Sequence, residues 1–359
     1  MIVKIDKASQ QITQILETLQ AGGIIAIPTD TIYGLAVDAT SEGAVKRLSS
    51  TKKRADKLFT LFMPKNEVEK FAVITKRKII DFFMPGPLTV ILKKRLGVSL
   101  PSITDRIGIR IPQHNFVLHL LSAYQKPLAV TSANISGEPS LTSPYEIVEH
   151  FTEVSIVIDG GMLYSMPSTV LDLTVTPPLV MRKGAIPILA IEKVYGRKLA
   201  LKGSLKFNVL FVCSGNTCRS PMAEGIFKTM VSRKYCEVQS AGTIAMGGLQ
   251  AAHYAKQVVK EYGGSIDRHR TSYLDRELVD WADLILVMEF KHYETILEIS
   301  PDSVVKTFLL REYKRKTKYT EVPDPVGRDL AAYQQAATKM YPTLKRVSKD
   351  IEGRFRRSR

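Results

Sequence analysis

A change of pattern near residue 206 constrains the fold of this chain more than any other feature. Before it, short apolar runs follow one another with few helical segments between them, whereas after it strands and helices alternate regularly. The second pattern predicts strands over 207–212, 237–240 and 284–288, and helices over 220–234, 249–262 and from about 329 onward. We therefore expect two domains, over 1–198 and 206–359, joined by a linker over 199–205.

The two patterns predict different α/β architectures. In the first part, residues 10–20 have helical spacing. Apolar runs typical of buried strands follow at 24–28, 59–63, 89–92, 107–111, 128–131, 156–158, 169–173 and 179–182. Because few helices separate these strands, we expect an α/β domain with a large mixed sheet. The regular alternation in the second part predicts a small doubly wound parallel sheet.

The composition limits the class of protein. The 359 residues are 45% hydrophobic and 24% charged, which is typical of globular domains and excludes disorder over most of the chain. Lys and Arg number 51 against 35 Asp and Glu, which gives a net charge of +16, and both halves are basic. This excess favours anionic partners such as nucleotides, phosphoryl groups and RNA.

The cysteines and the apolar runs bear on location. Three cysteines, all in the second half, argue against a disulfide framework and for a reducing compartment. The first residues show no signal-peptide pattern, and no run reaches the roughly 20 apolar residues that a membrane span needs. We therefore expect a cytoplasmic protein without a membrane partner.

A cysteine-containing loop follows the first strand of the second part. Residues 212–221 read Val-Cys-Ser-Gly-Asn-Thr-Cys-Arg-Ser-Pro. Between a buried strand and a helix, the backbone N–H groups of such a loop and the positive end of the helix point at one site, which suits a phosphoryl group. Arg219 can bind two phosphoryl oxygens, and the same field is expected to lower the pKa of Cys213 and make it a nucleophile.

Further residues complete this predicted site. The aspartate of Val-Pro-Asp-Pro-Val, Asp324, is the candidate general acid. The candidate catalytic residues are therefore Cys213, Arg219 and Asp324. The candidate phosphate-binding residues are Ser214, Gly215, Asn216, Thr217, Cys218 and Ser220.

The segment 213–220 together with Asp324 resembles the low-molecular-weight protein tyrosine phosphatases, over roughly residues 206–355. The segments 240–243 and 267–270 also stand where that family has similar sequences.

The resemblance implies a reaction through a cysteinyl-phosphate on Cys213, without a metal. Arg219 and the loop amides would bind phosphate, and Ser220 would support the thiolate. Asp324 would first donate a proton to the leaving group and then activate water.

Two departures from this family bear on the substrate. Tyrosine-specific members usually carry an aliphatic residue at the place of Thr217 and aromatic residues at the places of Val326 and Gly327. Aromatic walls would stack on a phenyl ring. Thr217 is similar to the residue of the protein-arginine-phosphatase branch, where its hydroxyl can orient water. We therefore favour phosphorylated proteins carrying phosphoarginine as substrates, with phosphotyrosine second.

Two questions stay open in this domain. Cys218 is either a small packed residue or a redox partner that traps an oxidised Cys213 as a disulfide. An arsenate reductase is the alternative activity on the same fold, with Cys236 as the one resolving cysteine beyond the loop.

The first part of the chain carries hydroxyl-rich and basic clusters at its predicted strand ends. They lie at 28–35, 52–57, 85–89, 110–114, 131–137, 167–170 and 182–186. Side chains at neighbouring strand ends can share one cavity. The sequence has no Walker-type phosphate loop and no Cys/His cluster for zinc.

This ordered set resembles the YrdC-like threonylcarbamoyl-adenylate synthases, over roughly residues 5–195. That family condenses L-threonine, bicarbonate and ATP to threonylcarbamoyl-AMP and pyrophosphate, for the t6A37 modification of tRNA. The resemblance implies threonine binding by Thr29, Arg110, Ser132 and Ser168. It implies ATP binding by Lys52, Arg54, Asp56, Asn134, Thr142 and Arg182, with Mg²⁺ accompanying ATP.

Departures from this second family concern its amino-acid substrate. Ala55 and Leu58 stand where prolines are common, and strand 59–63 lacks the histidine that many members use against threonine. The spacing of Arg54 and Lys57 is also similar to the YrdC-like module of hydrogenase-maturation carbamoyltransferases.

The two resemblances together imply a bifunctional enzyme. Its expected partners include tRNA or tRNA-modifying proteins for the first domain. The alternative is an RNA-binding first domain without synthase activity, fused to a phosphotyrosine phosphatase or an arsenate reductase.

Overall fold

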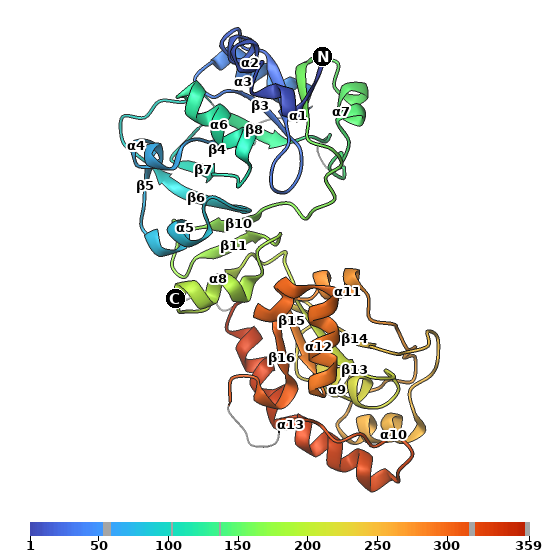
Figure 1. Cartoon of the computed structure of the whole chain (residues 1–359). Coiled ribbons are helices and arrows are strands. Elements are labelled where there is room, and N and C mark those ends of the chain that lie inside the picture. The colour runs from blue at the N-terminus through green and yellow to red at the C-terminus, as the bar shows by residue number, and fades with distance from the viewer. Residues whose placement is uncertain (53–58, 102, 136–137, 316–319, 356–359) are drawn as a thin grey trace. The chain divides into compact units, whose positions relative to one another are not determined.

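The chain divides into two compact units, Met1–Ile186 and Pro187–Arg359. A computed structural model describes residues 1–52, 59–101, 103–135, 138–315 and 320–355. Both units have an α/β architecture (Figure 1). None of the helices in these ranges has the length and apolar character that a membrane span requires.

The first unit is built on a mixed sheet. Its strands are β1 (Ile2–Lys4), β2 (Ile24–Ile27), β3 (Gly34–Asp38), β4 (Thr60–Phe62), β5 (Ala72–Val73), β6 (Leu88–Lys94), β7 (Arg106–Arg110), β8 (Leu128–Ser132), β9 (Val154–Asp159), β10 (Thr169–Asp172) and β11 (Leu179–Arg182). In space they follow the order β1-β9-β2-β3-β8-β4-β7-β6-β10-β11, and β5 pairs with β6. Because β2 runs parallel to β9 and antiparallel to β3, the predicted mixed sheet is confirmed.

The helices of this unit pack against several parts of the sheet. They are α1 (Ile5–Ala8), α2 (Ile12–Gln20), α3 (Glu42–Thr51), α4 (Val68–Phe71), α5 (Arg77–Phe83), α6 (Asn115–Tyr124) and α7 (Pro144–His150). Ile15 and Leu19 of α2 lie one helical turn apart and pack with Phe116 and Leu120 of α6 into one core. This core fixes the ends of the central strands, from which the polar clusters extend.

The second unit contains a small parallel sheet. Its strands are β13 (Phe207–Cys213), β14 (Cys236–Gly242), β15 (Leu284–Val287) and β16 (Thr307–Leu309), and the short strand β12 (Ala200–Leu201) is not one of them. The order β14-β13-β15-β16 with parallel pairing throughout confirms the predicted doubly wound sheet. In such a sheet, ligands bind at the carboxyl ends of the strands, here the end of β13.

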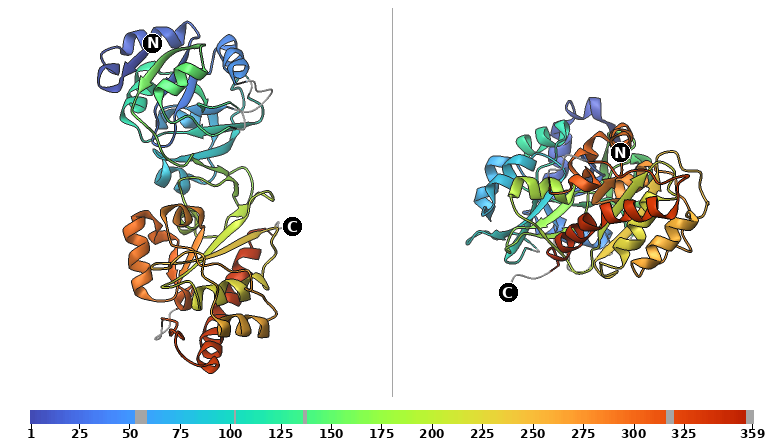
Figure 2. Two further views of the ribbon diagram at one scale, coloured as in Figure 1. Left: turned by 90° about the vertical axis from the view of Figure 1, so that its right-hand side faces the viewer. Right: turned by 90° about the horizontal axis from the view of Figure 1, so that it is seen from below.

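Helices lie on both faces of this parallel sheet (Figures 1 and 2). They are α9 (Arg219–Lys228), α10 (His253–Glu261), α11 (Arg276–Trp281), α12 (Phe290–Ile299) and α13 (Leu330–Glu352). A further helix of this unit, α8 (Ile188–Tyr195), precedes the first strand of the sheet in the chain. Helices α9, α10 and α13 contact one another, and α11 contacts α12.

The border between the units lies before the linker expected over 199–205. The helix α8 belongs to the second unit because Glu192 accepts hydrogen bonds from the buried guanidinium of Arg354, with Nη2 2.7 Å from Oε2. Arg354 also bonds Asp350 of α13 at 2.8 Å. Burial alone would raise the pKa of Asp350, but the neighbouring cations hold it below its ordinary value. The expected domain limits at 198 and 206 stay a prediction.

Two candidate active sites

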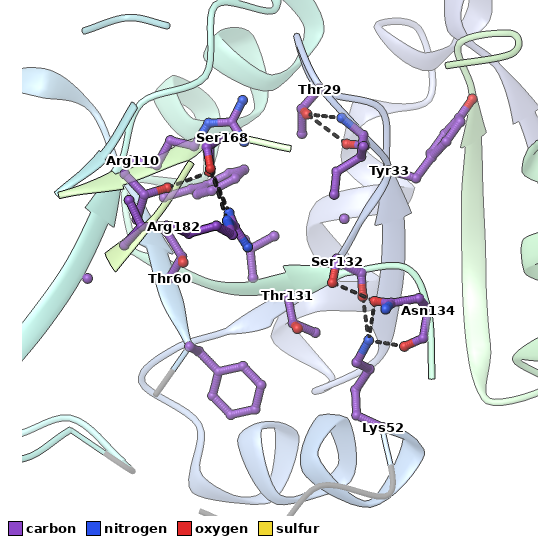
Figure 3. A pocket seen from close by; sticks show the side chains of 18 of the residues that line it. Thr29, Tyr33, Lys52, Thr60, Arg110, Thr131, Ser132, Asn134, Ser168 and Arg182 are labelled. Atoms are coloured by element: carbon purple, nitrogen blue, oxygen red, sulfur yellow. Dashed lines mark hydrogen bonds between the residues drawn. The ribbon is translucent and has the colours of Figure 1, made fainter. Parts of the chain in front are cut away.

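A cavity of about 410 Å³ opens at the strand ends of the first unit. Strands β3, β4, β6, β7, β8, β10 and β11 and the C-terminus of α3 contribute lining residues. Figure 3 shows one polar group at Arg110, Ser168 and Arg182 and a second at Lys52, Ser132 and Asn134. The cavity therefore has two separate polar regions.

Most of the residues predicted for this site line the cavity. They are Thr29, Arg110, Ser132 and Ser168 of the threonine-binding set, and Lys52, Asn134 and Arg182 of the ATP-binding set. Thr142 is not among the described lining residues, and its backbone N–H donates to Oε2 of Glu146 at 3.1 Å. Arg54 and Asp56 lie outside the described residues. The roles of all these residues stay predictions.

Thr29 organises the loop between β2 and β3. Its hydroxyl donates to the carbonyl of Ile32 at 2.7 Å and accepts from the backbone N–H of Thr31 at 3.1 Å. The Thr31 hydroxyl lies 3.1 Å from that of Thr29 and accepts a hydrogen bond from Nη1 of Arg110 at 2.9 Å. Thr29 and Arg110 are thus connected through Thr31.

Arg110 is buried and already has an acidic partner. Its Nη2 donates to Oδ1 of Asp30, and its guanidinium lies 5.9 Å from the centre of the Phe62 ring. Burial lowers the pKa of Arg110, whereas the Asp30 charge opposes that shift. Oδ2 of Asp30 is buried and has no hydrogen-bond partner in the described part of the chain. The charge of Arg110 is therefore largely compensated within the protein.

Arg182 makes a different set of contacts. Its Nε and Nη2 donate to the Ser168 carbonyl at 3.0 and 2.9 Å, and Nη2 also donates to the Ser168 hydroxyl at 2.9 Å. This hydroxyl lies 2.9 Å from that of Thr89. A side chain on Gly184 would place Cβ 2.2 Å from the Pro167 carbonyl oxygen, so a glycine allows β11 to approach the Ser168 segment.

Lys52 connects the second polar region. Its ammonium group donates to the carbonyl of Ser132 at 2.6 Å and to Oδ1 of Asn134 at 2.9 Å. The residue is 1% exposed. The Asn134 amide in turn donates to the carbonyl of Glu138 at 2.6 Å. This network holds the segment after β8 against the end of α3.

The loop from Cys213 to Arg219 joins β13 to α9 in the second unit. All six predicted phosphate-binding residues lie on it or in the first turn of α9. Asn216 adopts the left-handed region with φ +54°. Gly242 of β14 is required beside the loop, because a Cβ there would lie 2.4 Å from the Ser214 carbonyl oxygen.

The Cys213 thiol is buried at the base of this loop. Its sulfur lies 3.0 Å from the Ser220 hydroxyl, and that hydroxyl also accepts a hydrogen bond from Nδ2 of Asn216 at 2.9 Å. Burial raises the pKa of Cys213, although Ser220 and Arg219 act in the opposite direction. The expectation of a lowered pKa is therefore wrong for this structure, because desolvation outweighs the stabilising groups.

Arg219 is 1% exposed and is held by acidic side chains. Its Nη2 donates to Oδ2 of Asp324, and its Nη1 lies 3.2 Å from Oε1 of Glu289. Nη1 also donates to the Val322 carbonyl at 3.1 Å. The structure thus brings the predicted general acid to the predicted phosphate-binding arginine, and it adds a second carboxylate.

A hydrogen-bond network fixes Asn216 from behind the loop. Its Nδ2 donates to the Ser240 hydroxyl at 2.9 Å, and its Oδ1 accepts from the backbone N–H of Ser272 at 2.9 Å. Nε2 of His269 donates to the Asn216 carbonyl at 2.9 Å. The Ser240 hydroxyl donates to Glu224. The loop conformation is therefore held by the Ser240 side chain of β14 and by the His269 side chain and Ser272 backbone of the segment before α11.

Cys218 and Thr217 lie near α13 and the segment that precedes α10. The Cys218 sulfur is 3.2 Å from the Tyr333 hydroxyl, and burial raises the pKa of Tyr333. The Thr217 carbonyl accepts the N–H of Ala252 at 2.9 Å. These contacts show how Cys218 packs, and its redox role stays a prediction.

Comparison with known proteins identifies both units. The family model described as "Telomere recombination" (Sua5/YciO/YrdC) matches residues 17–184, and that described as "Low molecular weight phosphotyrosine protein phosphatase" matches 208–355. A putative threonylcarbamoyl-AMP synthase of Methanocaldococcus jannaschii is 42% identical over 46% of this chain and 82% of that protein. A protein-arginine-phosphatase of Geobacillus stearothermophilus is 35% identical over 41% of this chain and 98% of that protein. The chain belongs to both families.

A solved structure agrees with the first assignment. The crystal structure of Pyrococcus abyssi Sua5 complexed with L-threonine aligns with 86% of this chain and 98% of that one, with TM-score 0.51 and 25% identity. The chain spans about half the length of longer relatives, since the matched part covers 55% of the Pyrococcus abyssi threonylcarbamoyl-AMP synthase. The protein is thus a fusion of a Sua5/YrdC domain and a low-molecular-weight phosphatase domain, both of enzyme families.

The sequence did not reveal several residues of the phosphatase site. Glu289 and His292 stand at the start of α12, and no local motif marks them. Ser240 and His269 lie in segments that resemble the family, but their contacts with Asn216 required the structure. In the Sua5/YrdC domain, the phenyl rings of Phe59 and Phe62 also line the cavity and were not predicted to do so.

Proposed function

We propose that this protein is a bifunctional enzyme. Its Sua5/YrdC domain makes threonylcarbamoyl-AMP from L-threonine, bicarbonate and ATP, and its phosphatase domain hydrolyses phosphoryl groups of proteins, with phosphoarginine favoured. For the first activity, the supporting observation is that one cavity gathers seven of the predicted substrate-binding residues. For the second, it is the meeting of Arg219 and Asp324 beside the Cys213 loop.

The contacts of Arg110 and Arg182 suggest different roles for these two arginines in the synthase cavity. In the described residues, no carboxylate lies within 4 Å of Arg182, and its donors meet only Ser168. Arg182 is therefore the cation that an anionic group, the threonine carboxylate or a phosphate, would bind at lowest cost. Arg110, paired with Asp30, would instead position the loop of Thr29.

The proposed reaction forms two bonds in sequence. The threonine amine attacks bicarbonate and water leaves, which gives the carbamate. A carbamate oxygen then attacks the α-phosphorus of ATP, and pyrophosphate leaves. Fixed hydroxyls such as that of Ser168 would hold the carbamate, and the cations would offset charge on the triphosphate.

Magnesium would enter this site with ATP as part of the substrate. The described lining residues of the cavity include no aspartate or glutamate, so they offer Mg²⁺ no carboxylate ligand. An ion bound through phosphate oxygens and water fits this donor set, because Mg²⁺ keeps several waters and prefers oxygen ligands.

The synthase is tested by pyrophosphate release from ATP. Release should require both L-threonine and bicarbonate, and omission of either should remove it. Binding of tRNA without any such release would instead support the alternative of an RNA-binding domain. The net charge of +16 fits binding of polyanions such as tRNA. The same assay with added tRNA and its modifying enzymes would test whether the product is used for tRNA modification.

The proposed phosphatase reaction has two steps. The Cys213 thiol first loses its proton to water, and Asp324 takes one up when it leaves Arg219. The thiolate then attacks phosphorus, the bond to the leaving nitrogen or oxygen breaks, and Asp324 gives that atom its proton. The Asp324 carboxylate then takes a proton from water, which attacks phosphorus and breaks the S–P bond. Because Arg219 holds Asp324 and Glu289 in this structure, the incoming phosphoryl group must displace them.

Three observations support phosphoarginine over phosphotyrosine. Val326 and Gly327 follow Asp324-Pro325, so no aromatic wall stands there for a phenyl ring. Glu289, once displaced from Arg219, supplies a carboxylate for the guanidinium of the substrate. The Geobacillus stearothermophilus relative is named protein-arginine-phosphatase.

A direct competition decides the substrate class. Peptides carrying phosphoarginine or phosphotyrosine at one position are offered together to the full chain and to Cys213→Ser. Phosphate release from phosphoarginine should be faster and should depend on Cys213. Faster release from phosphotyrosine would reverse the preference, and arsenate reduction that depends on Cys236 would favour the reductase.

A further inference from the structure

His292 lies directly behind the catalytic loop and is fully buried at the start of α12. Both ring nitrogens have partners. The backbone N–H of Glu289 donates to Nδ1 at 3.1 Å, and Nε2 lies 2.9 Å from the hydroxyl oxygen of Ser214. Ser214 is the residue that follows the nucleophile Cys213.

These contacts fix the protonation of the ring. A backbone N–H can only donate, so Nδ1 must offer its lone pair, and the neutral ring then carries its proton on Nε2. Burial lowers the pKa of His292 to about 4, and Arg219 acts in the same direction, while Glu289 opposes it. The ring is therefore neutral near pH 7, and Nε2 donates to Ser214.

The donated hydrogen bond determines what the Ser214 hydroxyl can do. A hydroxyl whose oxygen accepts from His292 must point its own proton elsewhere. The side chain of Ser214 is half-buried at the loop, and Oε2 of Glu289, whose Oε1 contacts Arg219, lies 3.5 Å from Nε2 of His292. The hydroxyl thus belongs to the cluster that surrounds the phosphate-binding guanidinium.

We propose that His292 is a positioning residue that makes the Ser214 hydroxyl a hydrogen-bond donor to the phosphoryl group. A bound phosphoryl group presents acceptors only, so a hydroxyl with a fixed free proton binds it without reorienting. Ser220 offers a parallel, since its oxygen accepts from Asn216 and lies 3.0 Å from the Cys213 sulfur. The proposal rests on the phosphatase function and assigns a specific residue to phosphoryl binding.

Two substitutions of His292 separate this role from simple packing. In His292→Gln the terminal amide reaches the position of Nε2 and can still donate to Ser214. In His292→Asn the amide reaches the position of Nδ1, so the contact with Glu289 N–H persists while the donor to Ser214 is lost. The third variant is Ser214→Ala, and the fourth is the double variant His292→Asn with Ser214→Ala.

The measurements are kcat/KM with p-nitrophenyl phosphate and the inhibition constant of orthovanadate, each at pH 7. We expect His292→Asn and Ser214→Ala each to lose about tenfold, as for one hydrogen bond of roughly 1.4 kcal/mol, and His292→Gln to lose about threefold or less. The double variant should be no worse than Ser214→Ala, because both act on one interaction.

The outcomes distinguish a failure of the positioning role of His292 from a failure of the proposed phosphatase function. Equal losses in His292→Gln and His292→Asn, or additive losses in the double variant, would overturn the positioning role. Thermal unfolding of each variant shows whether a loss of activity comes from misfolding. If the His292 variants misfold, the inhibition constant of orthovanadate for Ser214→Ala decides. An unchanged constant would refute Ser214 as a hydrogen-bond donor to the phosphoryl group. A wild-type chain without Cys213-dependent turnover would refute the phosphatase function itself.

Discussion

Arg182 of the synthase cavity and Arg219 of the phosphatase loop are both candidates for binding an anionic group, but their present hydrogen-bond partners differ. The described contacts of Arg182 are with the neutral oxygens of Ser168. Arg219 is bound to the carboxylates of Asp324 and Glu289. An anionic group can therefore bind Arg182 without displacing a carboxylate, whereas at Arg219 it must displace Asp324 and Glu289.

This difference follows from the chemistry proposed for each site. A carboxylate on Arg182 would compete with the substrate and contribute nothing to adenylate formation. At Arg219 the competing carboxylate is itself a reactant, because the arrival of the phosphoryl group frees Asp324 to take up a proton and then donate it to the leaving group. Pairing thus keeps the general acid beside the nucleophile at the cost of weaker anion binding.

The largest expected effect is on Cys213→Ser, which removes the nucleophile of one site and leaves the other intact. Phosphatase kcat should fall by about 10⁴-fold or more, since a serine without a general base attacks poorly. Pyrophosphate release by the same preparation should keep its wild-type rate. Retained turnover of p-nitrophenyl phosphate would contradict the role of Cys213.

Asp324→Asn tests the exchange of partners at Arg219. Turnover should fall by about 10²–10⁴-fold through loss of the general acid. Inorganic phosphate should bind more tightly, because one competitor for the guanidinium is gone. Inhibition constants measured beside Asp280→Asn, an exposed aspartate paired with Arg276, control for the change in charge. Weaker phosphate binding in Asp324→Asn would show that Asp324 does not compete.

Arg182→Ala tests whether Arg182 binds an anionic group of a substrate in the synthase cavity. The KM for ATP or L-threonine should rise by about 10–100-fold, as for loss of a charged hydrogen bond. The substrate whose KM rises identifies the group that Arg182 binds. Arg77→Ala, at an exposed arginine paired with Glu69, is the matched control. Unchanged KM values for both substrates would remove Arg182 from the site.

Thr217→Ile examines substrate choice at the phosphatase loop. An aliphatic side chain should favour an aryl group and remove a hydroxyl that can orient water. The ratio of phosphotyrosine to phosphoarginine turnover should rise by roughly tenfold. Competition between the two phosphopeptides measures it, and an unchanged ratio would place the preference elsewhere.

The smallest effect expected is on the pH dependence of stability. His292 has its pKa lowered by burial from 6.5 to about 4, so between these values the unfolded chain binds a proton that the folded chain does not. The free energy of unfolding should therefore fall as pH falls through this window, and His292→Gln should flatten that slope. Trp281, the single tryptophan, reports unfolding of the second unit in urea at pH 7 and pH 5. Equal slopes in both proteins would contradict the assignment.

How far the sequence predicts each site depends on how local the site is. The phosphatase loop is contiguous from Cys213 to Ser220, so its residue types and spacing predict both position and chemistry. The partners of that loop come from β14, α12 and the segment before α11, and no spacing rule connects them. The direction of the Cys213 pKa is also not predictable from the loop sequence, because it depends on the burial of the thiol in the folded chain.

The residues of the synthase cavity, unlike those of the phosphatase loop, are spread along the chain. No single motif there is specific, yet the order of the clusters along the chain predicts the shared cavity. The strand β3 was overlooked because Gly34–Asp38 is short and follows a hydroxyl-rich loop, although all of it is buried. The pairing of Arg110 with Asp30 is also a product of the fold, since 80 positions separate them.

The buried cluster of Glu192, Arg354 and Asp350 has a practical consequence for dividing this protein. A shortened chain that begins at residue 206 would keep Arg354 and Asp350 but lose Glu192, and a buried cation would lose one of its anions. Breaking a buried pair in this way costs about 3–5 kcal/mol. An autonomous phosphatase fragment should therefore begin before α8, and the natural seam of the fusion lies ahead of that helix.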